Sequence, residues 1–146
     1  MYLVKKITIN EYKECYEIDL KTIKLWNMKQ WEEELRKKYV YGFACFSNYE
    51  IVGVCVFQKI ICNAELTYLS IHPTFKRKGL GKKLIKEIFK QCESFAIEKI
   101  QLEVSDKNLD ALNFYHAFGF KTIGIRKKYY KDGSNALLQE KKLLKK

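Results

Sequence analysis

Proline is nearly absent from this chain, which has one in 146 residues, at Pro73. No Ser/Gly-rich linker, internal repeat or low-complexity segment marks a boundary, so we expect residues 1–146 to form a single domain with its own core. No apolar run is long enough to span a bilayer, and the N-terminus lacks the pattern of a signal peptide. These absences predict a cytoplasmic protein that does not insert into a membrane.

Paired cysteines are also missing. The cysteines are odd in number and contain no Cys-x-x-Cys pair; they are Cys15, Cys45, Cys55, Cys62 and Cys92. Most of them fall in apolar runs, which favours reduced, buried thiols over a disulfide framework or a zinc site. We therefore expect no bound metal.

Acidic residues are few beside basic ones, 17 against 28, and the net charge is +11. This excess favours a polyanionic partner such as a nucleotide-like ligand, an acidic peptide or a nucleic acid. Many lysines fall at ordinary helix-surface positions, so charge alone does not establish nucleic-acid binding. Hydrophobic residues make up 47% of the chain and aromatic residues 14%, which excludes a disordered protein.

Hydrophobic periodicity predicts a mixed order of elements. Strands are expected over residues 3–9, 41–46, 51–57, 64–71, 99–104, 120–125 and about 136–144. Helices are expected after the N-caps Asn10, Asn27 and Asn108, and over residues 79–95. Antiparallel strands come first and helix crossovers follow, which predicts an α/β (mixed α+β) fold: a central mixed sheet of six to seven strands with helices on both faces.

The segment Lys76-Arg77-Lys78-Gly79-Leu80-Gly81 lies between a strand and a long amphipathic helix. Its glycines allow close approach of the backbone to a ligand, and the helix start offers free N–H groups and a positive dipole. Together with the basic side chains, this arrangement suits a phosphate or pyrophosphate. The alternative is an ordinary turn with solvated lysines, because short glycine motifs often match by chance.

Several motifs, in this order along the chain, resemble a GNAT acetyltransferase, most closely the RimI-type ribosomal-protein alanine N-acetyltransferases. They are Leu69-Ser70-Ile71-His72-Pro73, the basic glycine loop, Leu102-Glu103-Val104, Asn108, Ala111, Tyr115, Gly119-Phe120 and the segment Gly124 to Tyr130. The resemblance extends over most of the chain from about Ile51 onward. It implies a GNAT-like fold, acetyl-CoA as co-substrate and an amine as acceptor.

The resemblance also implies which residues bind the donor. The backbone of Leu69, Ser70 and Ile71 would pair with the pantetheine arm like an added strand. The pyrophosphate would lie on the loop formed by Lys76, Arg77, Lys78, Gly79, Leu80, Gly81 and Lys82. Asn108 matches a family position that contacts coenzyme A. The family usually has Gln or Arg at the first loop position, where this chain has Lys76.

Two further positions carry the chemistry of transfer. An α-amine has a pKa of about 7.7–8.0, so part of it must lose a proton before it can attack. Glu103 would be the general base, through a water, and Tyr115 would be the general acid that protonates the departing thiolate. The alternative is that Glu103 is a solvated strand residue and Tyr115 a core aromatic.

The identity of the acceptor amine stays open, because the chain departs from the RimI pattern at two places. An acidic pair near the end of the family's chains is replaced by Ser134-Asn135, and an arginine after the Leu-Glu-Val motif is replaced by Ser105. The first hypothesis is acetylation of a protein N-terminal α-amine, with a lysine side chain or a small-molecule amine as alternatives. A basic nucleic-acid-binding module and a GNAT fold that binds acyl-CoA without turnover also stay open. Nucleic acid would otherwise be contacted only through a ribosomal substrate.

Overall fold

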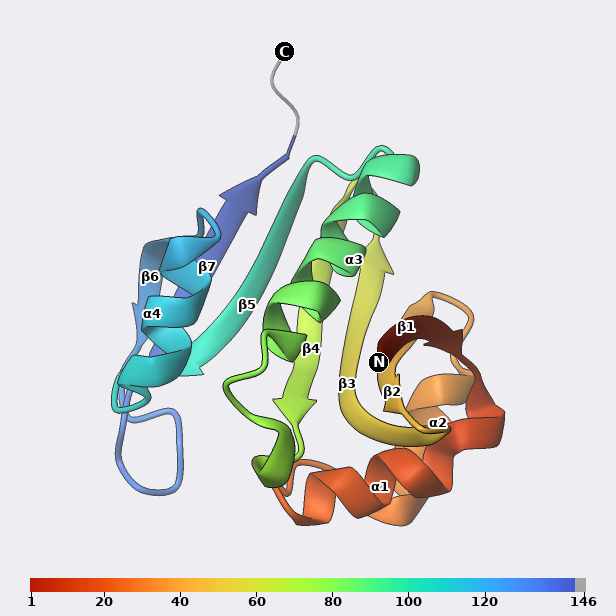
Figure 1. The fold of residues 1–146 in the computed structure, drawn as a ribbon. Helices are drawn as coiled ribbons and strands as arrows, with labels where there is room; N and C mark the ends of the chain where they lie inside the picture. Colours follow the sequence, from red (N-terminus) through yellow and green to blue (C-terminus); the bar gives the residue numbers. More distant parts are fainter. Residues whose placement is uncertain (144–146) are drawn as a thin grey trace.

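A seven-stranded mixed sheet forms the centre of the molecule (Figure 1). The structure is a computed structural model that describes residues 1–143. The strand order is β1-β2-β3-β4-β5-β7-β6, and only the β4–β5 pair is parallel. The strands are β1 Tyr2–Ile7, β2 Val40–Ser47, β3 Glu50–Ile60, β4 Asn63–Ile71, β5 Lys99–Ser105, β6 Lys121–Arg126 and β7 Ala136–Lys142.

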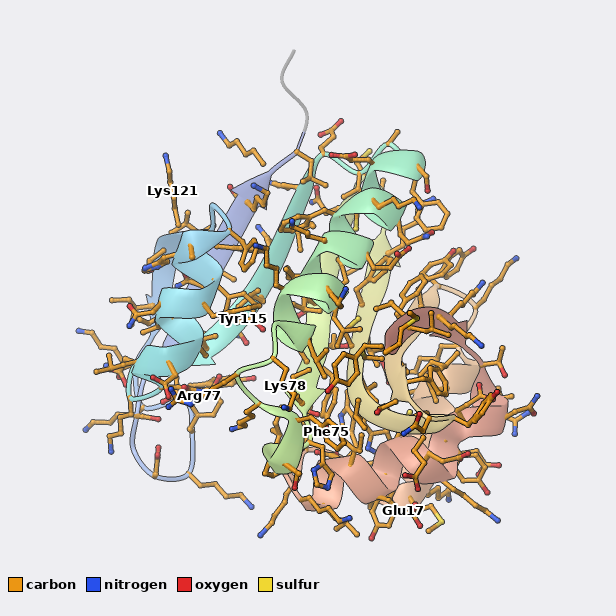
Figure 2. All side chains as sticks on the ribbon, viewed as in Figure 1. Glu17, Phe75, Arg77, Lys78, Tyr115 and Lys121 are labelled. Atoms are coloured by element: carbon orange, nitrogen blue, oxygen red, sulfur yellow. The ribbon has the colours of Figure 1, made fainter. Side chains whose placement is uncertain are left out.

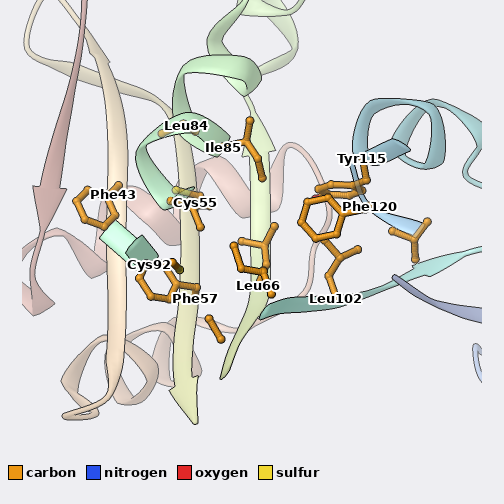
Figure 3. Close-up of a cluster of buried hydrophobic side chains, with 14 of the residues drawn as sticks. Phe43, Cys55, Phe57, Leu66, Leu84, Ile85, Cys92, Leu102, Tyr115 and Phe120 are labelled. Carbon is orange, nitrogen blue, oxygen red and sulfur yellow. The ribbon is translucent and has the colours of Figure 1, made fainter. Parts of the chain in front are cut away.

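Helices cover both faces of this sheet, as the sequence predicts. Helices α1 (Tyr12–Leu20) and α2 (Met28–Arg36) pack with Val54, Val56 and Tyr68 on one face. Helices α3 (Leu80–Ser94) and α4 (Leu109–Ala117) cover the other face, where the larger core lies. Figure 3 shows part of that core, with Leu84 and Ile85 from α3 and Tyr115 from α4 over the sheet. The predicted mixed α/β architecture is confirmed.

The third strand is central because its side chains are apolar on both faces. Residues 52–57 are buried throughout, with β2 and β4 as neighbours. A two-residue turn, Asn48-Tyr49, joins β2 to β3 with φ of +50° and +71°. Two successive positive φ values match the right-handed twist of a hairpin. The predicted hairpin at residues 47–50 is therefore confirmed.

The long helix α3 buries the apolar stripe expected from its sequence. Leu80, Leu84, Ile85, Ile88 and Cys92 recur at helical spacing and are fully or almost fully buried. Phe89 and Phe95, predicted for the same stripe, are only partly buried against this core. The helix crosses β2, β3 and β4, and its Leu84 side chain packs against Gly53. It ends near Phe95, and Ile97 then leads into β5 as another buried residue. This packing fixes the start of α3 beside the end of β4.

Four predicted details differ from the structure. Thr8, not Asn10, caps the first helical turn, because a 3₁₀ turn at Ile9–Glu11 precedes α1 and Glu11 completes a capping box with Thr8. For the same reason the first strand ends at Ile7. Cys62 is exposed, since it lies in the turn between β3 and β4. The last strand ends at Lys142, and Leu144 lies outside the described residues.

No helix within residues 1–143 has both the length and the apolar character needed to cross a membrane.

The packing of Gly53 leads to a stability prediction. A Cβ atom at this position would lie 2.7 Å from Ile71 Cδ1 and 3.3 Å from Leu84 Cδ1. We expect Gly53→Ala to lower the free energy of unfolding by about 1–3 kcal/mol through overpacking, measured by urea denaturation. Gly124→Ala on β6 is the control, because its Cβ would lie 3.8 Å from its nearest neighbour. Equal losses in the two variants would contradict this account of Gly53.

Candidate active site

The parallel strands β4 and β5 are hydrogen-bonded for only part of their length. They pair from Asn63 opposite Lys99 to Glu65 opposite Gln101, and then separate, as Figure 1 shows. Thr67 is the residue that causes the register shift against β3, since Val56 pairs with Tyr68 and Phe57 with Leu66. A bulge of this kind bends and twists the strand that contains it. It therefore turns β4 away from β5 while β4 stays paired with β3.

A cleft of about 470 Å³ occupies the place where the strands separate. This volume is within the range of roughly 300–1,000 Å³ common for ligand pockets. Strands β4 and β5 and helix α4 form its interior, the segment between α1 and α2 forms one wall, and the segment between β6 and β7 forms another. The lining residues are Ile23, Leu25, Glu65, Leu66, Thr67, Tyr68, Leu69, Leu102, Glu103, Val104, Ser105, Asn108, Ala111, Tyr115, Tyr129 and Tyr130.

Within residues 1–143, the edge of β4 beyond Glu65 has no strand partner on the cleft side. Leu69, Ser70 and Ile71 lie on this edge, so their backbone groups directed toward β5 have no ladder partner among residues 1–143. The Ser70 hydroxyl lies 2.6 Å from the Tyr68 hydroxyl and is buried, so only the main chain of Ser70 is available to a ligand. Such an edge can accept an extended ligand as an added strand.

The basic glycine loop leads from the end of β4 into α3. Arg77 and Gly79 have φ of +64° and +76°, which turns the backbone sharply before the helix begins. Within residues 1–143, the N–H groups from Arg77 to Lys82 donate to no protein acceptor, and no side chain caps α3. Unpaired N–H groups and a helix dipole of this kind suit an anion. Lys76, Arg77, Lys78 and Lys82 are exposed around the loop, whereas Leu80 is buried and offers only its main chain.

Glycine is needed at the two positions of this loop for different structural reasons. Gly79 requires a left-handed φ, and an added Cβ there would meet nothing within 4 Å. At Gly81 an added Cβ would lie 3.3 Å from the ring of Phe114 on α4. Gly81 therefore permits α3 and α4 to approach each other at the end of the cleft, in addition to leaving the backbone accessible. Figure 2 shows Arg77 and Lys78 on this loop and Tyr115 on α4, across the space between the two helices.

Glu103 points to the sheet face opposite α4 and lines the cleft. Its Oε2 atom lies 2.6 Å from Nε of Arg126 on β6, and the Glu103 side chain is 21% exposed. The two atoms form an ion pair without the alignment of a hydrogen bond, so this buried oxygen has no hydrogen-bond partner within residues 1–143. Since Oε2 has almost no exposed surface, a water or an amine in the cleft can reach this side chain only through its remaining exposed part.

Tyr115 projects from α4 against Phe114 and Phe120, and its side chain lines the same cleft. Burial of the phenol, with a small contribution from Cys55, raises the pKa of Tyr115 above its usual value. The phenol therefore keeps its proton throughout the neutral and mildly alkaline range. Asn108 begins α4, where its Oδ1 accepts a hydrogen bond from Ala111 N–H at 3.1 Å, and it also lines the cleft.

Comparison with known proteins gives the family. Residues 6–120 match the family model described as the acetyltransferase (GNAT) family. The chain belongs to the GNAT acetyltransferase family. A [ribosomal protein bS18]-alanine N-acetyltransferase of Haemophilus influenzae is 26% identical over 131 residues, which cover 89% of this chain and 88% of that protein.

Solved GNAT structures share the fold of the whole chain. The ribosomal-protein-S18-alanine N-acetyltransferase from Escherichia coli aligns with a TM-score of 0.93 and 21% identity, over 100% of this chain and 96% of that one. The PaiA N-acetyltransferase from Thermoplasma acidophilum, solved in complex with coenzyme A, aligns with a TM-score of 0.73 and 20% identity, over 97% and 99% of the chains.

Ser105 and Ser134-Asn135, where this chain departs from the RimI pattern, lie close together in the structure. Ser105 Oγ donates to Ser134 Oγ at 2.9 Å, and Asn135 Nδ2 donates to Asp106 Oδ2 at 2.8 Å. Asn135 also accepts the Lys128 N–H at 2.9 Å. These contacts tie the β6–β7 segment, with its cleft-lining tyrosines, to the end of β5. Ser105 and Ser134-Asn135 therefore support this wall of the cleft with their side chains bonded to each other and to Asp106.

Sequence reasoning assigned no role to Arg126 or Asp19. Arg126 lies opposite Ala136 on the same sheet face as Glu103, a relation that depends on the β5-β7-β6 strand order. Asp19 is fully buried beside Cys15 and Ile18. The sequence does contain a signal for Asp19, because a carboxylate at a position where a helix is expected to be apolar indicates a buried polar site.

Gly79 allows the glycine loop to be tested apart from overall stability. An alanine there must adopt a left-handed φ, which costs about 1 kcal/mol and displaces the N–H groups of the loop. We expect Gly79→Ala to weaken coenzyme A binding by about tenfold or more, as for a lost hydrogen bond to a charged group, measured by isothermal titration calorimetry.

Gly133→Ala is the matched control for Gly79→Ala. Gly133 has φ of +84° and also has nothing within 4 Å of an added Cβ, but it lies on the β6–β7 segment. The two variants should lose similar stability, and only Gly79→Ala should lose coenzyme A affinity. Unchanged affinity in Gly79→Ala would remove this loop from donor binding.

Proposed function

We propose that this GNAT enzyme transfers the acetyl group of acetyl-CoA to the α-amine at the N-terminus of a protein, in the manner of the RimI-type enzymes. The observation that carries the proposal is the cleft between β4 and β5, which brings Glu103 and Tyr115 together beside a strand edge with free backbone groups. The donor site and the proton-transfer roles of these two residues belong to the same proposal.

The donor would lie along β4 and the glycine loop. The free edge at Leu69–Ile71 would pair with the pantetheine amides, and the N–H groups from Arg77 to Lys82 would bind the pyrophosphate. Lys76, Lys78 and Lys82 would add a screened attraction for the phosphates. Asn108 would contact the pantetheine end from the start of α4, since its Nδ2 makes no hydrogen bond to residues 1–143. The thioester would then lie near Tyr115.

Glu103 would act as the base. The amine nitrogen attacks the thioester carbonyl carbon and gives up a proton, which the partly exposed Glu103 carboxylate receives directly or through a water. Arg126 holds this carboxylate in place and balances its charge. The carbon–sulfur bond then breaks, the new amide is released, and the electron pair remains on the coenzyme A sulfur.

Tyr115 would give its proton to that sulfur. Burial keeps the phenol protonated in the resting enzyme, so a donor is present when the thiolate leaves. The proton taken up by Glu103 balances the one lost by Tyr115, and both groups return to their resting forms through solvent. Binding donor and acceptor together supplies a further advantage of roughly 7–11 kcal/mol at best.

The chemistry of the base favours an α-amine over a lysine side chain. Near pH 7.5 about a third of α-amines are neutral, whereas about a thousandth of lysine side chains are. A base that consists of one carboxylate paired with an arginine suits the acceptor that loses its proton more readily, which is the α-amine. The names of the relatives, which specify the alanine of ribosomal protein bS18, also support a protein N-terminus. A ribosomal acceptor would place the enzyme in the cytoplasm.

The roles of the two proton-transfer residues can be tested directly. We expect Glu103→Gln and Tyr115→Phe each to lower kcat by about 10²-fold or more, since general acid–base catalysis contributes on that scale. Coenzyme A affinity, measured by calorimetry, should change little in either variant. Glu50→Gln and Tyr49→Phe are the controls, because both residues are exposed on the β2–β3 hairpin. Full turnover in both cleft variants would exclude these residues from the mechanism.

An acceptor panel tests the reaction and its substrate class together. The panel contains peptides with a free N-terminus, N-terminally blocked lysine peptides, polyamines and a ribosomal bS18 N-terminal peptide, each with acetyl-CoA and detection by mass spectrometry. We expect acetylation at the α-amine and the highest kcat/KM among the free N-terminal peptides. Preferred modification of lysine or polyamines would support the small-amine or lysine hypothesis instead.

The same samples test the two hypotheses in which the protein catalyses no reaction. A fold that binds acyl-CoA without turnover would gain thermal stability with coenzyme A and modify nothing in the panel. A nucleic-acid-binding module would gain no stability from coenzyme A and would bind RNA with an affinity that falls steeply with salt. Either result would overturn the proposed function.

A further inference from the structure

Asp19 is a charged residue at the centre of the smaller core. It is fully buried on α1, and its carboxylate accepts three N–H groups. Leu25 N–H lies 3.0 Å from Oδ1, and Trp26 N–H and the Trp31 indole Nε1 each lie 2.9 Å from Oδ2. A buried carboxylate is stable only when it is well bonded in this way.

Two of these donors belong to the segment between α1 and α2, residues 21–27. The backbone of Asp19 binds the same segment, because its carbonyl accepts Lys24 N–H at 2.9 Å and Thr22 N–H at 3.1 Å. Lys24 has φ of +58°, an uncommon value for a residue other than glycine. Asp19 therefore determines the path of a segment whose backbone conformation is not favoured by itself.

The segment is also fastened to β4. Thr22 Oγ1 lies 3.2 Å from the Tyr68 hydroxyl, which in turn lies 2.6 Å from Ser70 Oγ. The Trp26 ring stacks on the Tyr68 ring with centroids 5.8 Å apart. Tyr68 and Ser70 belong to the strand proposed to bind the donor. The segment thus has a fixed position relative to β4 as well as to α1.

The outward side of this segment is a wall of the cleft. Ile23 and Leu25 line the cleft, and they are 49% and 46% exposed. An acceptor chain that enters the cleft between β4 and β5 would meet these apolar side chains. The main chain of Leu25 is bonded to Asp19 while its side chain faces the cleft, so a displacement of the main chain would also displace the wall.

We propose that Asp19 is a positioning residue for the acceptor: by binding the N–H groups of Leu25 and Trp26 it holds the residue 21–27 wall at the place where an acceptor peptide contacts it. Asp19 touches neither substrate and acts through Leu25 and Ile23. The inference rests on the proposed function, in that it assigns this wall to a peptide acceptor.

An amide at position 19 separates positioning from simple packing. Asn has nearly the shape of Asp, but one of its two terminal groups is a donor and cannot accept from an N–H. The neutral amide of Asp19→Asn is a weaker acceptor than the carboxylate, and its NH₂ group faces Leu25 N–H in one orientation and the Trp26 N–H and the Trp31 indole in the other. We expect the acceptor-peptide KM to rise by about tenfold or more, as for a lost hydrogen bond to a charged group. The kcat at saturating peptide and the affinity for coenzyme A should stay within about twofold.

Trp31→Phe is the matched control. It removes the indole donor from the same carboxylate and destabilises the same core, but it leaves the Leu25 and Trp26 bonds intact. Its acceptor KM should stay within about twofold of the wild type. Hydrogen exchange supplies a second measurement: Asp19→Asn should speed exchange at the Leu25 and Trp26 amides and leave α3 unchanged.

Each outcome bears on the inference. Equal acceptor KM values in wild type and Asp19→Asn, or equal increases in Asp19→Asn and Trp31→Phe, would overturn it and leave Asp19 a packing residue. If Asp19→Asn does not fold, unprotected Leu25 and Trp26 amides in the wild type would overturn it, and protected ones would support it. Wild-type enzyme that acetylates small amines but no peptide would refute the proposed function, a result separate from any comparison of variants.

Discussion

The end of hydrogen bonding between β4 and β5 after Glu65 is the constraint on which the candidate site depends. The extra residue Thr67 lets β4 keep its pairing with β3 while it turns away from β5. Two consequences follow from this one irregularity. The backbone groups of residues 66–71 that point toward β5 have no ladder partner within residues 1–143, and Glu103 on the other strand comes to face the opening. Continued parallel pairing would satisfy the backbone groups and close the cleft.

The surface of the molecule carries an excess of positive charge, whereas the charge of Glu103 inside the cleft is balanced. Many of the basic side chains that give the net charge of +11 are exposed, and four of these exposed side chains surround the glycine loop. A polyanionic donor is attracted there, although salt screens such exposed charges. Inside the cleft, Glu103 is balanced by Arg126, and burial keeps the phenols of Tyr115 and Tyr68 neutral. In the proposed function such an opening would favour a neutral amine at the reacting position, which is the form that can attack a thioester.

The sequence predicted those parts of the structure that depend on local pattern. The apolar stripe of α3, the buried run of β3 and the turn at residues 47–50 follow from periodicity and turn chemistry. The ion pair of Glu103 with Arg126 could not be predicted, because it depends on β7 lying between β5 and β6. The bulge at Thr67 has no local signal, since it arises from pairing with β3. The exposure of Cys62 likewise depends on where one strand ends and the next begins.

The two walls of the cleft are held by the same kind of interaction. Asp19 accepts backbone N–H groups from the α1–α2 segment, and Asp106 accepts the N–H and the side-chain amide of Asn135 from the β6–β7 segment. In both cases a carboxylate outside the cleft fixes main-chain position, while the side chains that face the cleft make few polar contacts of their own. Ile23, Leu25 and Tyr129 are each about half exposed. Changes at these three positions can therefore alter the surface offered to an acceptor without disturbing either carboxylate or the donor strand. In the proposed function, choice of acceptor and transfer chemistry would thus depend on different side chains of one cleft.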